Sequence, residues 1–313
     1  MMKYLFILNQ ENLKLAEQEV VSLLAPKEFK RSAQFLVVDK INEKLIKRLA
    51  YTKNVYKILF ETKTIEKDIK KFNWQKYYKT SFLVRCSETE KERKYASLIW
   101  HILEKPKVNL SSPKTIFSFI KNESITYACQ PVWENDHKFE ERRSHLRPGH
   151  AGTSMHPKLA RAAINLTGIK KGKLVDLFCG SGGILLEAGL IGLKPIGYDI
   201  DELSIEKAKK NLKHYKVKNF ILYEKDSLKT NKKLNYLATD LPYGQSSKLS
   251  KELNLLYKQF FEFLKNNLKK NAVVIVKENT GYKKFIKHFK TKMFKQRIHK
   301  NMTKVIILIE STL

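Results

Sequence analysis

The sequence of 313 residues has only three cysteines, Cys86, Cys129 and Cys179. No two of them form a CxxC pair and none has a histidine partner at zinc spacing, so neither a disulfide framework nor a metal site is supported. Long apolar runs are also lacking. The stretches 5–8 and 305–309 fall far short of the roughly 20 residues of a membrane helix, and the first is too brief for a secretory signal. We therefore expect a cytoplasmic protein without a metal.

Acidic residues are scarce relative to basic ones. The chain has 61 Lys and Arg against 31 Asp and Glu, a formal net charge of +30. A compact chain with this excess repels itself unless a polyanion meets it, and RNA or DNA is the obvious candidate. Nearly all of the excess is lysine, which also accumulates on heat-adapted proteins without any nucleic-acid role. Because no acidic segment balances the charge, we favour nucleic-acid binding over compositional drift.

The first half of the chain predicts two small α+β units, in keeping with a length that suggests two or three domains. In residues 1–62, strand and helix patterns alternate as in a ferredoxin-like domain: strands over 4–9, 35–38 and 55–60, and helices over 13–24 and 45–50. Residues 63–132 predict a basic helix, a strand over 82–86, an apolar helix over 95–103, and strands over 115–120 and 124–129. Residues 133–154 lack a regular period, and we interpret them as a linker.

Residues 155–313 predict a doubly wound α/β domain. Strand patterns over 174–178, 195–198, 220–223, 236–239 and 272–276 alternate with helical patterns over 157–166, 184–191, 202–215, 253–268 and 282–289. Two adjacent strands follow over 293–298 and 305–309, and their short polar connection requires an antiparallel pair. A mostly parallel sheet that closes with one reversed strand resembles the Rossmann-like, seven-stranded sheet of class I S-adenosylmethionine-dependent methyltransferases.

A glycine-rich turn follows the first strand of this domain: Asp176-Leu177-Phe178-Cys179-Gly180-Ser181-Gly182-Gly183. The spacing of its glycines does not fit the GxGxxG motif, which argues against the binding of a dinucleotide cofactor. The second and third strands end in Asp199-Ile200 and Asp226-Ser227. Carboxylates at these strand ends can accept from a ribose diol and from the adenine amino group.

We therefore predict an S-adenosylmethionine site made by Asp176, Phe178, Cys179, Gly180, Gly182, Asp199, Ile200, Asp226, Ser227 and Asp240. Each feature also has a structural explanation. The glycines can serve strand–helix packing, and Asp226 can cap a turn. Asp201 is better explained as the N-cap of the next helix than as a ligand.

The fourth strand runs into Thr239-Asp240-Leu241-Pro242-Tyr243-Gly244. This matches the (Asp/Asn/Ser)-x-Pro-aromatic motif of enzymes that methylate an exocyclic amino nitrogen of a base. Asp240 can accept a hydrogen bond from that amino group and take up its proton. Pro242 fixes the turn, and Tyr243 offers a face for an extruded base. The structural alternative is a proline turn after a buried strand, with Tyr243 in the core.

With these motifs in place, the whole chain resembles the archaeal tRNA (guanine-10-N2) methyltransferases. The most specific segments are 154–161, 176–188 and 239–244. The resemblance implies that 63–132 is a THUMP domain that grips the tRNA acceptor end. It also implies that Met155 and His156 lie near the cofactor, although both could equally pack at the helix start. Arg147 and Lys158 would face RNA at the domain junction.

The chain departs from the family pattern at two motif positions. Leu241 replaces a second proline, which is tolerable because only its main chain is needed, and Gln245 stands where arginine is expected.

We expect a tRNA guanine-N2 methyltransferase that acts on guanine 10 and adds one methyl group or two. Guanine-N2 methylation at another tRNA position, such as 6, or in ribosomal RNA uses the same chemistry. A DNA adenine-N6 methyltransferase shares the motif around Asp240, but the two α+β units favour folded RNA. An RNA-binding module with an inactive methyltransferase domain is the alternative from another class. The sequence leaves open the oligomeric state and the need for a small accessory subunit.

The charge predicts RNA binding that is strongly sensitive to salt. If the protein neutralises about 6–10 phosphates, its affinity for tRNA should fall by roughly 10³–10⁵-fold between 50 and 200 mM salt. Filter binding over a salt series measures this slope. A slope near zero would mean that the lysine excess serves no polyanion.

Overall fold

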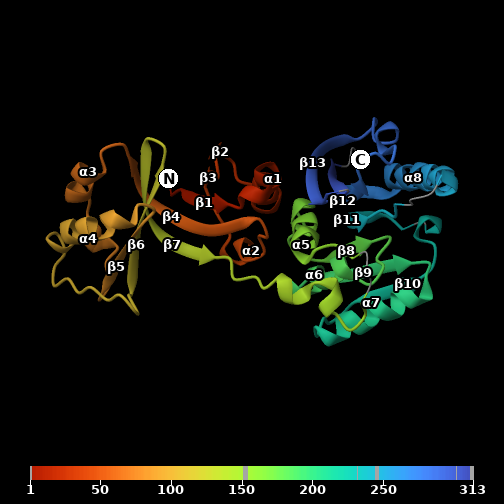
Figure 1. The fold of residues 1–313 in the computed structure, drawn as a ribbon, viewed down its shortest axis with the longest axis horizontal. Coiled ribbons are helices and arrows are strands. Elements are labelled where there is room, and N and C mark those ends of the chain that lie inside the picture. Colours follow the sequence, from red (N-terminus) through yellow and green to blue (C-terminus); the bar gives the residue numbers. More distant parts are fainter. Residues whose placement is uncertain (1, 151–153, 231, 244–246, 301, 311–313) are drawn as a thin grey trace. The chain divides into compact units, whose positions relative to one another are not determined.

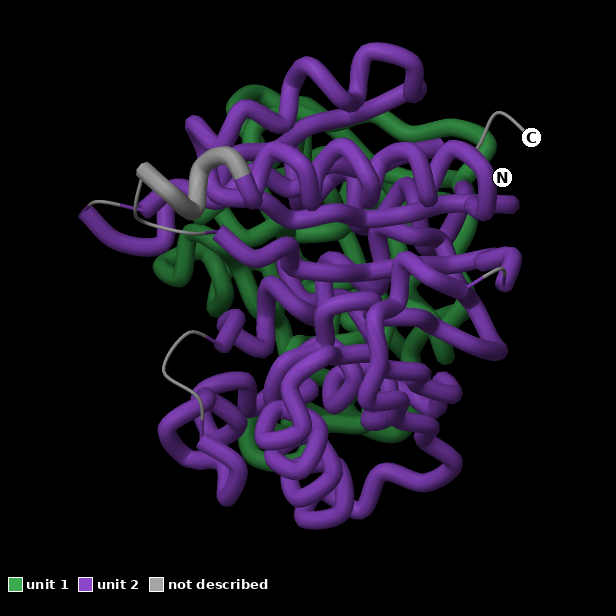
Figure 2. Tube along the Cα trace, turned by 90° about the vertical axis from the view of Figure 1, so that its right-hand side faces the viewer, with its two compact units in different colours: residues 1–13, 26–47, 52–135 green, residues 14–25, 48–51, 136–313 purple. Residues whose placement is uncertain are grey.

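The computed structural model describes residues 2–150, 154–230, 232–243, 247–300 and 302–310. They form two compact units (Figure 2). Unit 1 comprises Met1–Leu13, Pro26–Lys47 and Thr52–Asn135, and unit 2 comprises Lys14–Ala25, Arg48–Tyr51 and Asp136–Leu313. Each unit is built on a seven-stranded sheet (Figure 1).

The sheet of unit 1 has the order β2-β3-β1-β4-β7-β6-β5. Its strands are β1 (Tyr4–Leu8), β2 (Phe29–Ser32), β3 (Phe35–Val38), β4 (Thr52–Thr62), β5 (Phe82–Cys86), β6 (Thr115–Asn122) and β7 (Ile125–Glu134). Neighbours are antiparallel except β5 and β6, which run parallel. The long strand β4 pairs with β1 on one side and with β7 on the other, so the two predicted α+β units share one continuous sheet.

Strand β2 was not expected from the sequence. Its residues Phe29–Ser32 are mostly exposed and carry no alternation of apolar and polar side chains. It forms a hairpin with β3 across a short turn in which Ala33 adopts a positive φ of 50°. Because β2 lies at the sheet edge, it needs no apolar face, and hydrophobic periodicity cannot reveal it.

The described residues of unit 1 form three α-helices: α2 (Glu43–Ile46), α3 (Ile65–Lys71) and α4 (Glu92–Trp100). Helix α4 ends three residues before the expected boundary at 103. Around residues 63–132 lies an apolar cluster centred on the fully buried Trp74, whose ring meets Phe117 edge-on at 4.8 Å. The indole Nε1 of Trp74 donates to the Ile69 carbonyl at 2.8 Å, so the ring's polar group is satisfied within the core.

The sheet of unit 2 has the order β10-β9-β8-β11-β12-β14-β13, as expected for a class I methyltransferase fold. Its strands are β8 (Lys173–Asp176), β9 (Lys194–Asp199), β10 (Ile221–Glu224), β11 (Leu234–Asp240), β12 (Leu268–Lys277), β13 (Lys290–His299) and β14 (Met302–Glu310). The first five in spatial order are parallel, and β14 runs antiparallel to both of its neighbours. The predicted fold, including the reversed strand, is confirmed.

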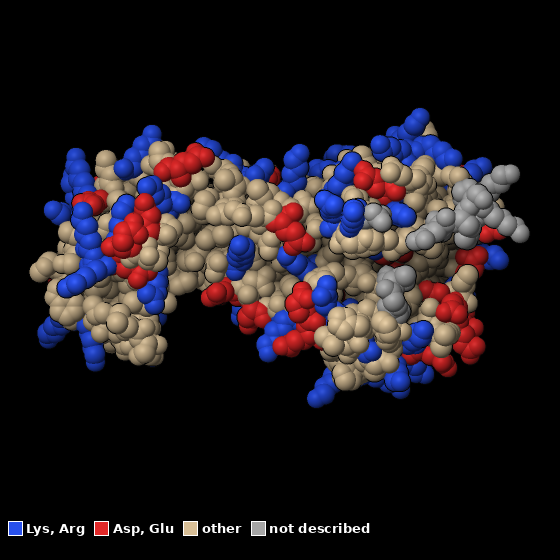
Figure 3. Space-filling view, in the orientation of Figure 1, with Lys and Arg blue, Asp and Glu red and all other residues tan. Residues whose placement is uncertain are grey.

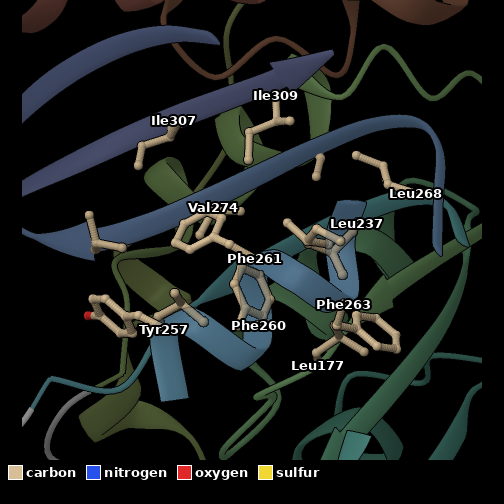
Figure 4. Close-up of a cluster of buried hydrophobic side chains, with 14 of the residues drawn as sticks. Leu177, Leu237, Tyr257, Phe260, Phe261, Phe263, Leu268, Val274, Ile307 and Ile309 are labelled. Atoms are coloured by element: carbon tan, nitrogen blue, oxygen red, sulfur yellow. The ribbon is translucent and has the colours of Figure 1, made fainter. Parts of the chain in front are cut away.

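The α-helices of unit 2 are α1 (Leu13–Leu24), α5 (Pro157–Leu166), α6 (Gly183–Leu190), α7 (Glu202–His214) and α8 (Ser247–Asn267). Leu13, the first residue of α1, is assigned to unit 1. The apolar stripe of α8 packs against the sheet. Tyr257, Phe260 and Phe261 belong to one buried cluster with strand residues such as Val274 and Ile307 (Figure 4). A smaller cluster around Leu186 and Leu212 joins α6 to α7.

The prediction of a helix over 282–289 is wrong. After β12 the chain turns sharply, with positive φ at Asn279 and Gly281, and only Tyr282–Lys284 form one turn of 3-10 helix. Tyr282 and Ile286 are nevertheless buried in the α8 cluster, with Phe285 and Phe289 packed against it. The helix-like spacing therefore reflects four apolar anchors on an irregular segment. Similarly, Leu268 begins β12 instead of ending the preceding helix.

A buried polar network holds α1 and residues 48–51 within unit 2. The carboxylate of Glu19 accepts from the backbone N–H groups of Ala50 and Tyr51 at 2.8 and 2.9 Å, and from the Asn165 amide at 2.7 Å. Arg48 donates to the Asn165 side-chain oxygen at 3.2 Å. Burial raises the pKa of Glu19 and, together with Arg161, lowers the pKa of Arg48 to about 10. Glu19 and Asn165 are thus hydrogen-bonded inside the protein, whereas the Arg48 Nε is buried without a hydrogen-bond partner.

Among the described residues, no helix is both long and apolar enough to cross a lipid bilayer.

We predict that Phe260→Ala destabilises the protein by about 3–5 kcal/mol, since it leaves a cavity against the sheet and removes the contact with the Phe178 ring, whose centroid lies 5.9 Å away. Leu255→Ala, on the exposed side of the same helix, is the matched control, because 56% of Leu255 is already accessible to solvent. Urea unfolding measures both. Equal and small shifts of the midpoint would contradict the packing described for α8.

Candidate active site

Two neighbouring cavities lie at the carboxyl ends of the parallel strands of unit 2. The first has a volume of about 340 Å³ and the second about 410 Å³. They share the lining residues Phe178, Gly180, Asp240 and Pro242. Asp176, Met155 and Tyr243 line the first cavity, whereas Asp199, Asp226 and Ser227 line the second. A ligand that extends through both would therefore pass the glycine-rich turn and Asp240.

The glycine-rich turn between β8 and α6 is shaped by close backbone approach. Gly182 has a φ of +80°, and a Cβ added there would lie 3.1 Å from the Ala208 Cβ of α7, so a side chain would be both strained and crowded. The turn is tied to the neighbouring strand because the Cys179 N–H donates to the Tyr198 carbonyl at 2.9 Å. Cys179 itself is buried and lines the first cavity, where burial raises the pKa of its thiol.

Asp176, the last residue of β8, is buried at 2% exposure. Its Oδ1 accepts from the Thr239 hydroxyl at 2.7 Å and from the Phe178 N–H at 3.2 Å. Burial raises the pKa of this carboxyl to about 7, because the two hydrogen bonds offset only part of the desolvation and the charges of Asp240 and Asp199 add to it. The carboxyl is thus poised to ionise when a cationic group arrives.

Asp199, the last residue of β9, connects two backbone segments. Its Oδ2 accepts from the Gly180 N–H at 2.8 Å, and its Oδ1 accepts from the Asp201 N–H at 3.1 Å. Each carboxylate oxygen keeps a lone pair for a further donor, such as a ribose hydroxyl. The adjacent Ile200 lines the second cavity and is 76% exposed there, which suits it to cover a planar ring.

Asp201 and Asp226 both cap the start of a helical segment. Asp201 caps α7 by accepting from the Ser204 N–H at 2.9 Å. Asp226 caps a short 3-10 turn by accepting from the Leu228 N–H at 3.0 Å, yet it also lines the second cavity. Its neighbour Ser227 is buried and donates to the Leu177 carbonyl at 3.0 Å, which ties the end of β10 to the turn after β8.

Asp240 ends β11 between the two cavities. Its Oδ2 forms an ion pair with Lys304, while its Oδ1 is buried and has no hydrogen-bond partner. Burial raises the pKa of Asp240, and Lys304 opposes that rise. The following turn is held by the Leu241 N–H, which donates to the Ile275 carbonyl at 2.9 Å, and by the Tyr257 hydroxyl, which donates to the Pro242 carbonyl at 3.2 Å.

Tyr243 lines the first cavity and is half-buried, so its ring is not part of the apolar core. The Lys304 Nζ lies 5.3 Å from the centroid of that ring. Gly244 and Gln245 fall outside the described residues.

The residues placed by family resemblance separate into two groups. Met155 is buried and lines the first cavity. His156 lines neither cavity: it caps α5, its Nδ1 accepting from the Lys158 N–H at 3.2 Å and its Nε2 lying 3.0 Å from a Glu140 carboxylate oxygen. For His156, the geometry therefore favours the structural explanation.

The expectation that Arg147 faces RNA is wrong, since only 3% of the residue is exposed. Its Nε donates to the Arg142 carbonyl at 2.8 Å and its Nη1 to the Ser154 hydroxyl at 3.2 Å, which fixes the segment that leads into Met155. Lys158 is half-buried, with its Nζ 4.4 Å from the centroid of the Tyr51 ring.

Sequence reasoning missed two charged groups behind the site. Glu187 of α6 is fully buried and pairs with Arg161 at 2.6 Å and with Arg142 at 2.8 Å, which locks α6 against α5. Lys304 was missed as well. It lies in β14 directly before the apolar run 305–309, and both faces of this strand are buried, so the adjacent apolar run is the only local signal and no two-residue period singles out the lysine.

Comparison with known proteins identifies relatives along the entire chain. Residues 144–305 match the family model of the RMKL-like methyltransferase domain. The tRNA (guanine(10)-N2)-dimethyltransferase of Methanothermobacter thermautotrophicus is 30% identical over 99% of both chains, and that of Pyrococcus abyssi is 29% identical over 95% of this chain and 96% of its own.

Solved structures show the same fold. TrmN from Thermus thermophilus aligns with a TM-score of 0.52 and 16% identity, covering 98% of this chain and 99% of its own. A possible methylase from Clostridium difficile aligns with a TM-score of 0.52 and 17% identity, covering 100% and 98%.

We predict that affinity for S-adenosylmethionine depends on pH through Asp176. Its carboxyl has a raised pKa of about 7, so between pH 7 and 5 a growing fraction is protonated and cannot pair with the ligand's ammonium group. The dissociation constant should rise by up to about tenfold per pH unit below 7. In Asp176→Asn, binding should be weaker at pH 7.5 and flat between pH 5 and 7. Calorimetry measures both proteins, and an equal pH slope in the variant would exclude Asp176 as the titrating group.

Proposed function

The chain belongs to the family of tRNA (guanine(10)-N2)-dimethyltransferases, which use S-adenosylmethionine, and we propose that its own reaction is methylation of the exocyclic N2 of guanine 10 in tRNA. The observation that carries this proposal is the state of Asp240. It is a buried carboxylate between two cavities, with one oxygen paired and the other free to accept. An exocyclic amino group is the donor that such an oxygen fits.

The residues around the two cavities fit S-adenosylmethionine. Asp199 would accept from the ribose hydroxyls, Asp226 and Ser227 would border the adenine, and Asp176 would pair with the ammonium group. The backbone of Gly180 and Gly182 admits the ligand closely because neither carries a side chain. When bound, this cofactor supplies an electrophilic methyl group on a sulfonium. Met155 and Phe178 contribute apolar lining next to these polar groups.

Asp240 would act on the target nitrogen. The lone pair of an exocyclic amino nitrogen is delocalised into the base, which makes it a poor nucleophile. A hydrogen bond to Asp240 Oδ1 favours a pyramidal nitrogen with its lone pair released, and the same oxygen can take up the proton. Tyr243 would stack on the extruded base, worth about 1–3 kcal/mol. Pro242 fixes the turn between these two residues.

We propose that two methyl groups are added. After the first transfer, N2 still carries one hydrogen, and the single free oxygen of Asp240 can hold that hydrogen as it held the first. Nothing in this arrangement requires an amino group with two hydrogens. The two archaeal relatives are named dimethyltransferases, which supports the same product.

For the rest of the chain we propose the division expected from the sequence: a ferredoxin-like domain over 1–62, a THUMP domain over 63–132, a linker over 133–154 and the methyltransferase domain over 155–313. The THUMP domain would hold the acceptor end of tRNA. On the face drawn in Figure 3, Lys and Arg are interspersed with Asp and Glu, and the excess of 61 Lys and Arg over 31 Asp and Glu supports a polyanionic substrate. Because the named relatives come from archaea, whose tRNA lies in the cytoplasm, we propose that location for this chain as well.

The reaction is tested with labelled S-adenosylmethionine and two unmodified tRNA transcripts, one with guanine and one with adenine at position 10. We expect incorporation into the first transcript only, recovered as N2-methyl- and N2,N2-dimethylguanosine. Equal incorporation into both would move the target to another position. Binding without incorporation would indicate an inactive domain or a missing accessory subunit.

We further predict that Asp240→Ala lowers turnover at least 10³-fold, because an acceptor and base are lost together, general base catalysis alone being worth about 10²–10⁴-fold. The affinity for tRNA should stay within a few-fold, since a carboxylate does not contact the phosphates that dominate such affinity. Asp201→Ala, at a helix cap outside the cavities, is the control and should retain turnover. A loss of tRNA affinity as large as the loss of turnover would assign Asp240 to binding instead.

A further inference from the structure

Lys304 is a buried lysine in the apolar strand β14. Only 3% of the residue is exposed, and the strand continues with the fully buried Ile306 and Ile307. Burial of an ammonium group is costly unless a partner compensates it. Within the described part of the chain, its ion pair is with Asp240 Oδ2. The compensation therefore comes from the residue that lies between the two cavities.

The pair connects strands that are not neighbours. In the sheet, β12 lies between β11 and β14, with Asp240 opposite Ile275 and Lys277 opposite Lys304. The Lys304 side chain thus reaches past β12 to the end of β11. The reversed strand, which carries no residue of the sequence motifs, delivers a charge to the centre of the site.

We propose that Lys304 is a positioning residue that keeps Asp240 ionised and leaves only its Oδ1 available to the amino group of the target base. This inference rests on the proposed function. With Oδ2 held by the ammonium group, the carboxylate cannot rotate freely, and the buried Oδ1, which has no hydrogen-bond partner, is left as the acceptor for the base. A protonated Asp240 would accept more weakly from the amino group and could not take up its proton.

Lys304 also contacts the second motif residue. Its Nζ lies 5.3 Å from the Tyr243 ring centroid, on which the base would stack. An ammonium group near an aromatic ring is attracted to the ring face, so the same charge orients both the acceptor and the stacking platform. One side chain from β14 therefore fixes the two groups that the motif contributes to the base.

The proton balance of the reaction is compatible with this arrangement. As the N2–CH₃ bond forms and the S–CH₃ bond breaks, N2 becomes cationic and strongly acidic. One of its protons then passes to Asp240 Oδ1, and the carboxyl releases it to water when the product leaves. Because the cationic nitrogen is so acidic, a carboxylate whose basicity is reduced by Lys304 still accepts the proton. Lys304 keeps its own protons throughout.

Other titratable groups face Asp240 from the elements around it. Asp176 on β8 and Tyr257 on α8 interact with it electrostatically, and Tyr243 follows it in the turn. Asp176 has a pKa of about 7 and could affect the same pH range. Turnover must therefore be measured with S-adenosylmethionine and tRNA both saturating, so that protonation of Asp176 affects cofactor affinity and not the rate constant.

The test compares the pH dependence of kcat in the wild type, Lys304→Met, Lys304→Gln and Lys304→Arg. Removal of an opposite charge at this distance raises a carboxyl pKa by about 1–3 units. In the Met and Gln variants we expect the acidic limb of kcat to move up by at least one pH unit. At pH values below the wild-type limb, kcat should therefore fall by about tenfold for each unit of that shift. Arg should restore the wild-type profile. Affinity for S-adenosylmethionine at pH 8 should stay within about twofold.

Lys290→Met is the matched control, because Lys290 is an exposed lysine of the neighbouring strand that pairs with Glu310. It should leave the profile unchanged. The proposal is overturned if the Met or Gln variant folds and keeps the wild-type acidic limb, or if Arg shifts it as Gln does. If the Lys304→Met variant fails to fold, the comparison of Lys304→Gln with Lys304→Arg still tests the proposal. A wild type that methylates no guanine would instead refute the proposed function.

Discussion

The ion pair of Asp240 and Lys304 is the interaction on which the site depends. Both side chains are largely withdrawn from water, so each requires the other. Their pairing demands that β14 run antiparallel beside β12 and that β11 end at the level of Ile275. The reversed strand typical of this fold thus has a chemical consequence, because it brings a cation to the carboxylate that faces the base.

The parallel strands supply the remaining carboxylates by the same geometric rule. Parallel strands end at one edge of a sheet, so Asp176, Asp199 and Asp240 gather there although they are far apart in the sequence. Each is then held differently. Asp176 is buried with few donors and has a raised pKa, whereas Asp199 accepts from two backbone N–H groups. Similar residues therefore suit different tasks: one pairs with an ammonium group, one accepts from hydroxyls, and one accepts from an amino group.

Features that depend on local pattern were predictable from the sequence. The alternation of apolar segments was sufficient to predict the parallel sheet, the helices α5 to α8 and the closing antiparallel strands. The spacing of the motifs was sufficient to predict the aspartates at the strand ends. Features that depend on distant partners were missed. The polar edge strand β2 has no periodicity, and Tyr282–Phe289 has a helical spacing without forming a helix. Arg147 is buried near Gly183 and Glu187 of α6, which its own segment does not reveal. Lys304 was missed because its partner lies two strands away.

The most direct measurement of the central claim is a double-mutant cycle in tRNA binding with S-adenosylhomocysteine present. One change is Asp240→Ala, which removes the acceptor, and the other is inosine in place of guanosine 10, which removes only the exocyclic amino group. If Asp240 Oδ1 accepts from that group, the loss of the amino group weakens binding several-fold in the wild type and has little effect in the variant. Equal losses in both proteins would contradict a contact between Asp240 and the base.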